Sequence, residues 1–147
     1  MNKKVMIAGT FDIIHPGHIF FIKEAAKLGE VYVVVSTDKN AEKFKGEGPV
    51  VPEQQRLEVI KNIKNVHKAM LGRKDNDTLK IVEEINPDII LLGPDQEYDI
   101  NTLKRGLEEK DLGKIEVIRL DKYYNKYALD SSTKIKKKVC EKCDRID

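Results

Sequence analysis

Tryptophan, long hydrophobic runs and widely spaced cysteines are all lacking in this 147-residue chain. Because no apolar stretch approaches the roughly 20 residues that a membrane helix needs, we do not expect a membrane-spanning protein. The apolar segment at residues 5–8 is too short for the core of a secretory signal, which predicts a cytoplasmic location. The two cysteines, Cys140 and Cys143, lie close together near the end of the chain and cannot staple the fold.

A charge excess of one sign is also lacking. The 27 lysine and arginine residues nearly balance the 25 aspartate and glutamate residues, which leaves a net charge of +2. Such a balance gives no overall attraction to nucleic acid or to a membrane surface, so we expect neither partner. Any anion-binding site must therefore be local. The length and the 40% hydrophobic composition are typical of one folded globular domain.

Short apolar runs alternate with amphipathic segments from one end of the chain to the other. The pattern contains no repeat and no linker, and it predicts an α/β fold: a single Rossmann-like, doubly wound parallel sheet of five strands. Ligands bind such sheets at the carboxyl ends of the strands. We expect the domain to cover residues 1–135 and a basic, cysteine-containing tail to follow at 136–147. The predicted strands are 5–8, 31–35, 66–71, 88–92 and 115–120, and the predicted helices are 17–28, 52–63, 79–85, 103–109 and one that begins at Ser131 or Ser132.

The most informative segment is residues 9–18, which follow the first predicted strand and read Gly-Thr-Phe-Asp-Ile-Ile-His-Pro-Gly-His. Pro16 and Gly17 set a helix start, where free N–H groups and the helix dipole attract phosphate. His15 and His18 lie on one side of that start. Their rings could donate hydrogen bonds to the oxygens that gain negative charge when a phosphorus atom is attacked.

Two other uses of these histidines are less well supported. A metal site needs three or four ligands, and no cysteine or carboxylate obviously completes one with His15 and His18, so we expect no metal ligands in the protein. A redox dinucleotide is disfavoured because the segment lacks the Gly-x-Gly-x-x-Gly turn.

A second group of polar residues opens the last predicted helix, at Ser131-Ser132-Thr133-Lys134. Hydroxyls, exposed amide N–H groups and a lysine at one helix start make a phosphate grip, although the same residues would also form an ordinary helix cap. Asp95 follows the fourth predicted strand, where it could accept hydrogen bonds from a base or ribose or simply form a turn.

These motifs resemble the signature of the cytidylyltransferase-like nucleotidyltransferases, Gly-Thr-Phe-Asp with His-x-Gly-His and a later Ser-Ser/Thr-Thr-x-Ile. Asp130 stands where that family usually has isoleucine. The resemblance covers residues 1–135 and implies catalytic roles for His15, His18, Lys45 and Lys134, and a phosphate-binding role for Arg56. It also implies a nucleotide-binding set: Thr10, Phe11, His15, Pro16, Gly17, His18, Asp95, Tyr123, Ser131, Ser132 and Thr133.

Within this family the chain resembles the archaeal FAD synthases, which share a Gly-x-Asp-Gln stretch like that at residues 93–96 and carry C-terminal cysteines. This resemblance implies transfer of AMP from ATP to FMN with release of pyrophosphate. The alternative is a glycerol-3-phosphate cytidylyltransferase-like enzyme that uses CTP and a phosphorylated alcohol or sugar, but its usual Gly-Asp-Asp-Trp stretch is absent. A non-catalytic nucleotide-binding sensor is a further alternative.

The proposed reaction sets its own requirements for cofactors and partners. Mg²⁺ or another divalent cation would arrive with the triphosphate, held mainly by phosphate oxygens and water. An acceptor phosphate is ionised at neutral pH and needs no strong general base. Small domains of this type commonly pair, so a homodimer is possible. The two cysteines are expected to be reduced and to take no part in the chemistry.

Overall fold

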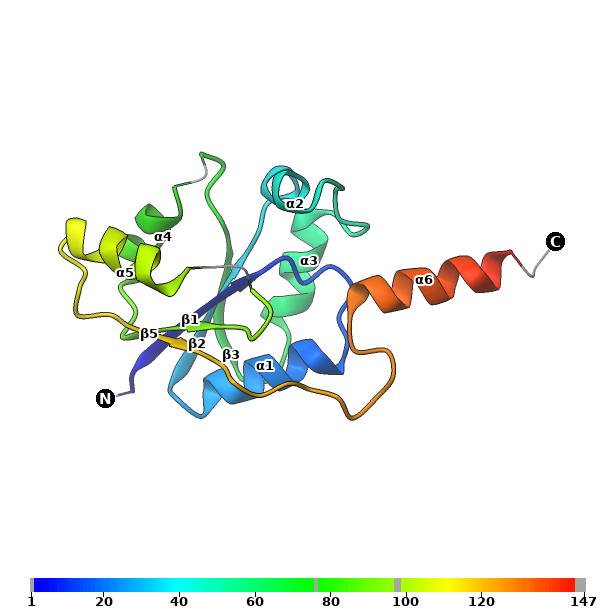
Figure 1. Cartoon of the computed structure of the whole chain (residues 1–147), viewed down its shortest axis with the longest axis horizontal. Helices are drawn as coiled ribbons and strands as arrows, with labels where there is room; N and C mark the ends of the chain where they lie inside the picture. Colours follow the sequence, from blue (N-terminus) through cyan, green and yellow to red (C-terminus); the bar gives the residue numbers. More distant parts are fainter. Residues whose placement is uncertain (1, 76, 97–98, 145–147) are drawn as a thin grey trace.

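The computed structural model describes residues 2–75, 77–96 and 99–144 (Figure 1). Its strands form one parallel sheet in the order β3-β2-β1-β4-β5, which confirms the predicted fold class. The strands are β1 (Lys4–Gly9), β2 (Glu30–Val35), β3 (Val66–Leu71), β4 (Ile89–Leu92) and β5 (Glu116–Arg119), and the helices are α1 (Pro16–Ala26), α2 (Asp38–Lys45), α3 (Glu53–Lys61), α4 (Thr78–Ile85), α5 (Ile100–Glu109) and α6 (Ser132–Cys143).

The core lies on both faces of this sheet. Val5 and Ile7 of β1 pack with residues of α1 and α3, whereas Met6 packs with residues of α4 and α5 on the other face. This division follows from the alternating direction of side chains along a strand. The chain winds from β1 to β2 and β3 in one direction and then returns to β4 and β5 on the other side of β1. The order therefore reverses beside β1, and a ligand is expected at the carboxyl ends of the strands there.

Helix α2 is not among the helices predicted from the sequence. Lys45 is its last residue, and the loop that follows begins at Gly46, whose φ of 78° suits glycine. The prediction failed because α2 buries only Ala41 and so shows no apolar repeat. Its start is stabilised by Thr37, whose Oγ1 accepts a hydrogen bond from the Asn40 amide over 3.2 Å.

Helix α6 is capped by Ser131 and projects away from the body of the molecule (Figure 1). None of its residues is buried. The tail expected at 136–147 begins inside this helix, which continues without a break to Cys143, and both cysteines are exposed. Across the described ranges, no helix has the length and apolar character required to cross a membrane.

Candidate functional site

The two histidines of the first turn are locked to the start of α1. His15 is the N-cap of the helix, and its Nδ1 accepts a hydrogen bond from the Gly17 amide over 3.1 Å. The Nδ1 of His18 accepts a hydrogen bond from the His15 amide over 3.3 Å. The ring centroids lie 3.8 Å apart. Because both Nδ1 atoms are acceptors, a neutral ring carries its proton on Nε2 and can donate it to a ligand.

Both rings are neutral at pH 7. Burial lowers the pKa of His18 to about 3, and the nearby charges of His15 and Lys45 act in the same direction, whereas Asp12 opposes them. Burial also lowers the pKa of His15, against the opposing charge of Asp130. The site therefore presents two neutral Nε2–H donors.

The start of α6 meets this turn directly. The Oγ of Ser132 accepts a hydrogen bond from the Ile13 amide over 3.3 Å and donates one to the Ile13 carbonyl over 3.0 Å. A Cβ placed on Gly17 would lie 3.2 Å from the carbonyl oxygen of Asp130, so the two chain segments are in close contact. The structure thus brings the amide-rich starts of α1 and α6 together, as the pairing of the two motifs requires.

Lys134 stands at this junction with an acidic partner. Its Nζ lies 2.7 Å from Oδ1 of Asp130, the residue that departs from the family pattern. The hydrogen bond from Lys134 lowers the pKa of Asp130, and the charge of His15 contributes to the same shift. Ser131 uses its Oγ to accept a hydrogen bond from the Lys134 amide over 3.1 Å, while Thr133 is exposed.

Asp12 is a buried residue of the turn after β1. The sequence alone gave it no functional role. Its carboxylate accepts hydrogen bonds from the amides of Val50 over 2.9 Å and Val51 over 2.8 Å, and it forms a 2.7 Å ion pair with Nζ of Lys136. Burial would raise the pKa of Asp12, but the hydrogen bonds from Lys136, Val51 and Val50 outweigh it and lower the pKa. The apolar neighbours of Asp12 in the sequence could have indicated that its carboxylate is buried. They could not have indicated its partners, which lie far away along the chain.

Arg56 is almost completely buried beneath the first turn. Its side chain is 1% exposed. The guanidinium donates hydrogen bonds to the carbonyls of Val51, Thr10 and Ser36 and to the carboxylate of Asp38, over 2.7–2.9 Å. These bonds hold the turn after β1 against the segment before α3. The geometry therefore gives Arg56 a structural function, and its phosphate-binding role stays a prediction.

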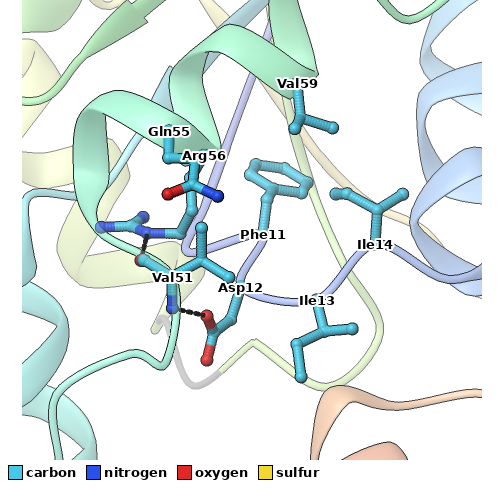
Figure 2. A pocket seen from close by; sticks show the side chains of 8 residues that line it. All are labelled: Phe11, Asp12, Ile13, Ile14, Val51, Gln55, Arg56 and Val59. Atoms are coloured by element: carbon cyan, nitrogen blue, oxygen red, sulfur yellow. Dashed lines mark hydrogen bonds between the residues drawn. The ribbon is translucent and has the colours of Figure 1, made fainter.

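Phe11 faces a cavity of about 230 Å³ between the first turn and α3 (Figure 2). Phe11 itself adopts a φ of 53°, and its ring centroid lies 5.3 Å from that of His18. The cavity adjoins the histidines but is not lined by them, nor by the start of α6. It is lined mostly by apolar side chains: Phe11, Asp12, Ile13, Ile14, Val51, Gln55, Arg56 and Val59.

The remaining candidates occupy loops around the same end of the sheet. Asp95 is exposed in the loop after β4, which Gln96 ties to β1 by a 2.7 Å hydrogen bond from Nε2 to the Ala8 carbonyl. Thr10 is half-buried beside the turn. Tyr123 is 62% exposed between β5 and α6. Its neighbour Tyr124 packs on Phe20 of α1, with the ring centroids 5.6 Å apart, and the nucleotide-binding role of Tyr123 stays a prediction.

The family model described as cytidylyltransferase-like matches residues 6–138, which is most of the chain. The chain belongs to the cytidylyltransferase-like family. Because it belongs to this family, the protein is a nucleotidyltransferase. This confirms the prediction made from residues 9–18 and 131–134. The matched region includes both helix starts described above and ends within α6.

Relatives of this cytidylyltransferase-like protein cover nearly its whole length. It is 52% identical to the FAD synthase of Methanobrevibacter smithii over 93% of this chain and 90% of that protein. It is 41% identical to the FAD synthase of Thermococcus sibiricus over 94% and 93%. A crystal structure of a lipopolysaccharide core biosynthesis protein from Thermoplasma volcanium matches with a TM-score of 0.79 and 39% identity, covering 84% of this chain and all of that one. The predicted resemblance to archaeal FAD synthases is confirmed.

Proposed function

We propose that this protein is a FAD synthase, which transfers AMP from ATP to FMN and releases pyrophosphate. The observation that carries the proposal is the meeting of two helix starts around two neutral imidazoles and Lys134. Such a junction gathers fixed hydrogen-bond donors without a general base, which suits an acceptor that is already ionised. The identity of 40–52% to proteins named FAD synthase favours ATP and FMN as the pair of substrates.

In the proposed step, a phosphate oxygen of FMN attacks the α-phosphorus of ATP. The bond from that phosphorus to the bridging oxygen breaks, and pyrophosphate leaves with the electron pair. His15 and His18 donate their Nε2 protons as hydrogen bonds to oxygens that become more negative in the transition state. Lys134 and the amides at the start of α6 hold the rest of the polyphosphate. Lys45 approaches from the end of α2.

A divalent cation such as Mg²⁺ would offset negative charge on the departing pyrophosphate. Phosphate oxygens and water would supply most of its ligands. This arrangement suits the donor set, because no group of three or more histidine, cysteine, aspartate or glutamate side chains in the part of the chain that is described could hold a metal ion.

The proposal is tested by a matrix of four nucleoside triphosphates against FMN, glycerol 3-phosphate and other phosphorylated acceptors. Release of pyrophosphate should be greatest with ATP and FMN, and FAD should form in equal amount. Turnover of CTP with glycerol 3-phosphate, and none with FMN, would replace the proposal by the cytidylyltransferase alternative. Binding of nucleotide with no pyrophosphate from any acceptor would identify a sensor.

A cytoplasmic homodimer belongs to the same proposal. Exposed apolar side chains, among them Val50 and Val59 at 65% and 45%, are consistent with a contact surface beside α3. Light scattering of the purified protein across a concentration series would give its mass in solution, and a constant monomer mass would exclude the dimer. Detection of the native protein in the cytosolic fraction of its own cells would test the location.

A further inference from the structure

Helix α6 is attached to the rest of the protein in an unusual way. It buries none of its residues and projects from the body of the molecule (Figure 1). Apolar packing, which holds most helices in place, is therefore weak here. Its position depends instead on polar contacts with the first turn, and these contacts decide where Lys134 and the amides at the start of α6 stand.

Two such contacts arise from one side of α6. Ser132 bonds to both backbone groups of Ile13, and Lys136 forms its 2.7 Å ion pair with the neighbouring Asp12. Ser132 and Lys136 are four residues apart, so they lie above one another on the same helix face. A single contact would let the helix pivot, whereas two contacts one turn apart fix both its direction and its rotation.

The ion pair is better shielded than an ordinary surface pair. The Asp12 side chain is 4% exposed and that of Lys136 is 39% exposed. Asp12 is itself immobilised, because the amides of Val50 and Val51 hold both of its carboxylate oxygens. Lys136 therefore binds to a fixed anion in partly desolvated surroundings, where a charge pair is screened less than at the surface.

We propose that Lys136 is a positioning residue, which seats the start of α6 on the histidine turn through its ion pair with Asp12. This inference rests on the proposed function for its catalytic consequence. Lys136 does not contact the substrates; it keeps the Ser131–Lys134 segment in the position that binds triphosphate. If that position is populated for only part of the time, the apparent affinity for ATP falls by the same fraction.

The first test compares Lys136→Met with Lys137→Met, a matched change at an exposed residue of the same helix. Hydrogen–deuterium exchange of residues 131–143 is measured in the ligand-free proteins. Exchange should be faster in Lys136→Met and unchanged in Lys137→Met, and Lys136→Arg should restore the wild-type rate. Equal exchange in Lys136→Met and wild type would overturn the inference.

The second test separates binding from turnover. With ATP and FMN, Lys136→Met should raise KM for ATP by about tenfold and change kcat by no more than about twofold, because the loss acts on the population that can bind. Rescue by Lys136→Arg is again expected. A loss confined to kcat would contradict a positioning role.

The two proposals can fail separately. Exchange in the ligand-free protein does not depend on which reaction is catalysed, so a response in α6 without FAD synthesis would remove only the proposed function. Normal FAD synthesis with an unresponsive α6 would remove only this inference. Should Lys136→Met fail to fold, Lys136→Gln, which also lacks the charge, is measured in its place, and exchange should again be faster in α6 and unchanged in α1.

Discussion

The starts of α1 and α6 meet at one place in the molecule, yet different forces hold them there. Helix α1 buries Ile22 and Ala25, both 0% exposed, in the main core cluster. Helix α6 buries nothing and is attached through Ser132 and Lys136. Both helices are capped and both present free amides, so they look alike as phosphate-binding elements. They should differ in how they respond to substitution, salt and pH.

This difference separates two kinds of experiment. Since the backbone of α1 is fixed by packing, a change at its histidines should act on the chemistry and leave the position of the helix unaltered. Since α6 is fixed by hydrogen bonds and charge, a change there should act mainly on the affinity for nucleotide. Substitutions at each helix start can therefore show which part of the site a kinetic effect comes from.

The largest effect is expected from His18→Ala, with a parallel result for His15→Ala. Either change removes an Nε2–H donor, which should cost about 2–4 kcal/mol of transition-state stabilisation, or roughly 30- to 1,000-fold in kcat. The fold should remain, because α1 is packed into the core beyond these rings. Steady-state kinetics with ATP and FMN and a thermal melt measure the two quantities. The control is His67→Ala on β3, where the histidine is half exposed and pairs with Glu30; near-normal turnover in both site variants would contradict the assigned roles.

Gly17→Ala tests the contact between the two helix starts. Its Cβ would lie 2.8 Å from Cε1 of His15 and 3.2 Å from the Asp130 carbonyl oxygen, so the ring or α6 must move. We expect a loss of about 1–3 kcal/mol in the free energy of unfolding, as for other overpacked sites, together with lower kcat/KM. Gly48→Ala is the control, because its Cβ would meet no atom within 4 Å. Equal stability of the two variants in urea would show that the junction is looser than described.

Acid should reveal the burial of His18 at the α1 start. The pKa of His18 falls from 6.5 to about 3 on folding, so the unfolded chain binds more protons than the folded one between these values. Stability should therefore decrease as the pH is lowered from 6.5 towards 3, by about 2 kcal/mol at pH 5 from this residue. His18→Asn should show a weaker decrease in urea unfolding at pH 7 and pH 5. A His18 resonance that titrates near pH 6.5 in the wild type would exclude this account.

The ion pair that holds α6 should behave differently over the same range. The pKa of Asp12 is lowered, so its carboxylate stays ionised well into acid and the pair with Lys136 persists. Mild acid should thus lower the free energy of unfolding through His18 while the ion pair that holds α6 stays formed in the folded protein.

The sheet and the two phosphate-binding helix starts could be predicted because each depends on neighbours in the sequence. Strands β1, β2 and β4 consist mostly of buried apolar residues, and Ser131 is the cap of its own helix. Helix α2 could not be found by apolar periodicity, since Ala41 is its single buried residue. The pairing of Asp12 with Lys136 joins residues 124 positions apart, and a single sequence does not show which of many lysines supplies the partner.

Arg56 was assigned a phosphate-binding role from the sequence, but in the structure its guanidinium binds backbone carbonyls. A basic residue near the start of a helix is as suitable for phosphate as it is for binding backbone carbonyls, and only burial distinguishes the two uses. Here the guanidinium is enclosed and its carbonyl partners come from three different segments. The sequence could therefore identify which segments surround the site, but not which of their basic side chains face the ligand.

The smallest expected effect is that of Asp130→Asn, and its sign is informative. Asp130 holds Lys134 at the α6 start, where an anionic ligand should also bind, so its carboxylate competes with the triphosphate for the same ammonium group. Removing that charge should lower KM for ATP by about two- to threefold, because an exposed pair contributes little. Asp121→Asn, at an exposed position after β5, is the control. A higher KM in Asp130→Asn would instead mean that the carboxylate orients Lys134 for binding, and the α6 start would then depend on a second ion pair as well as on Lys136.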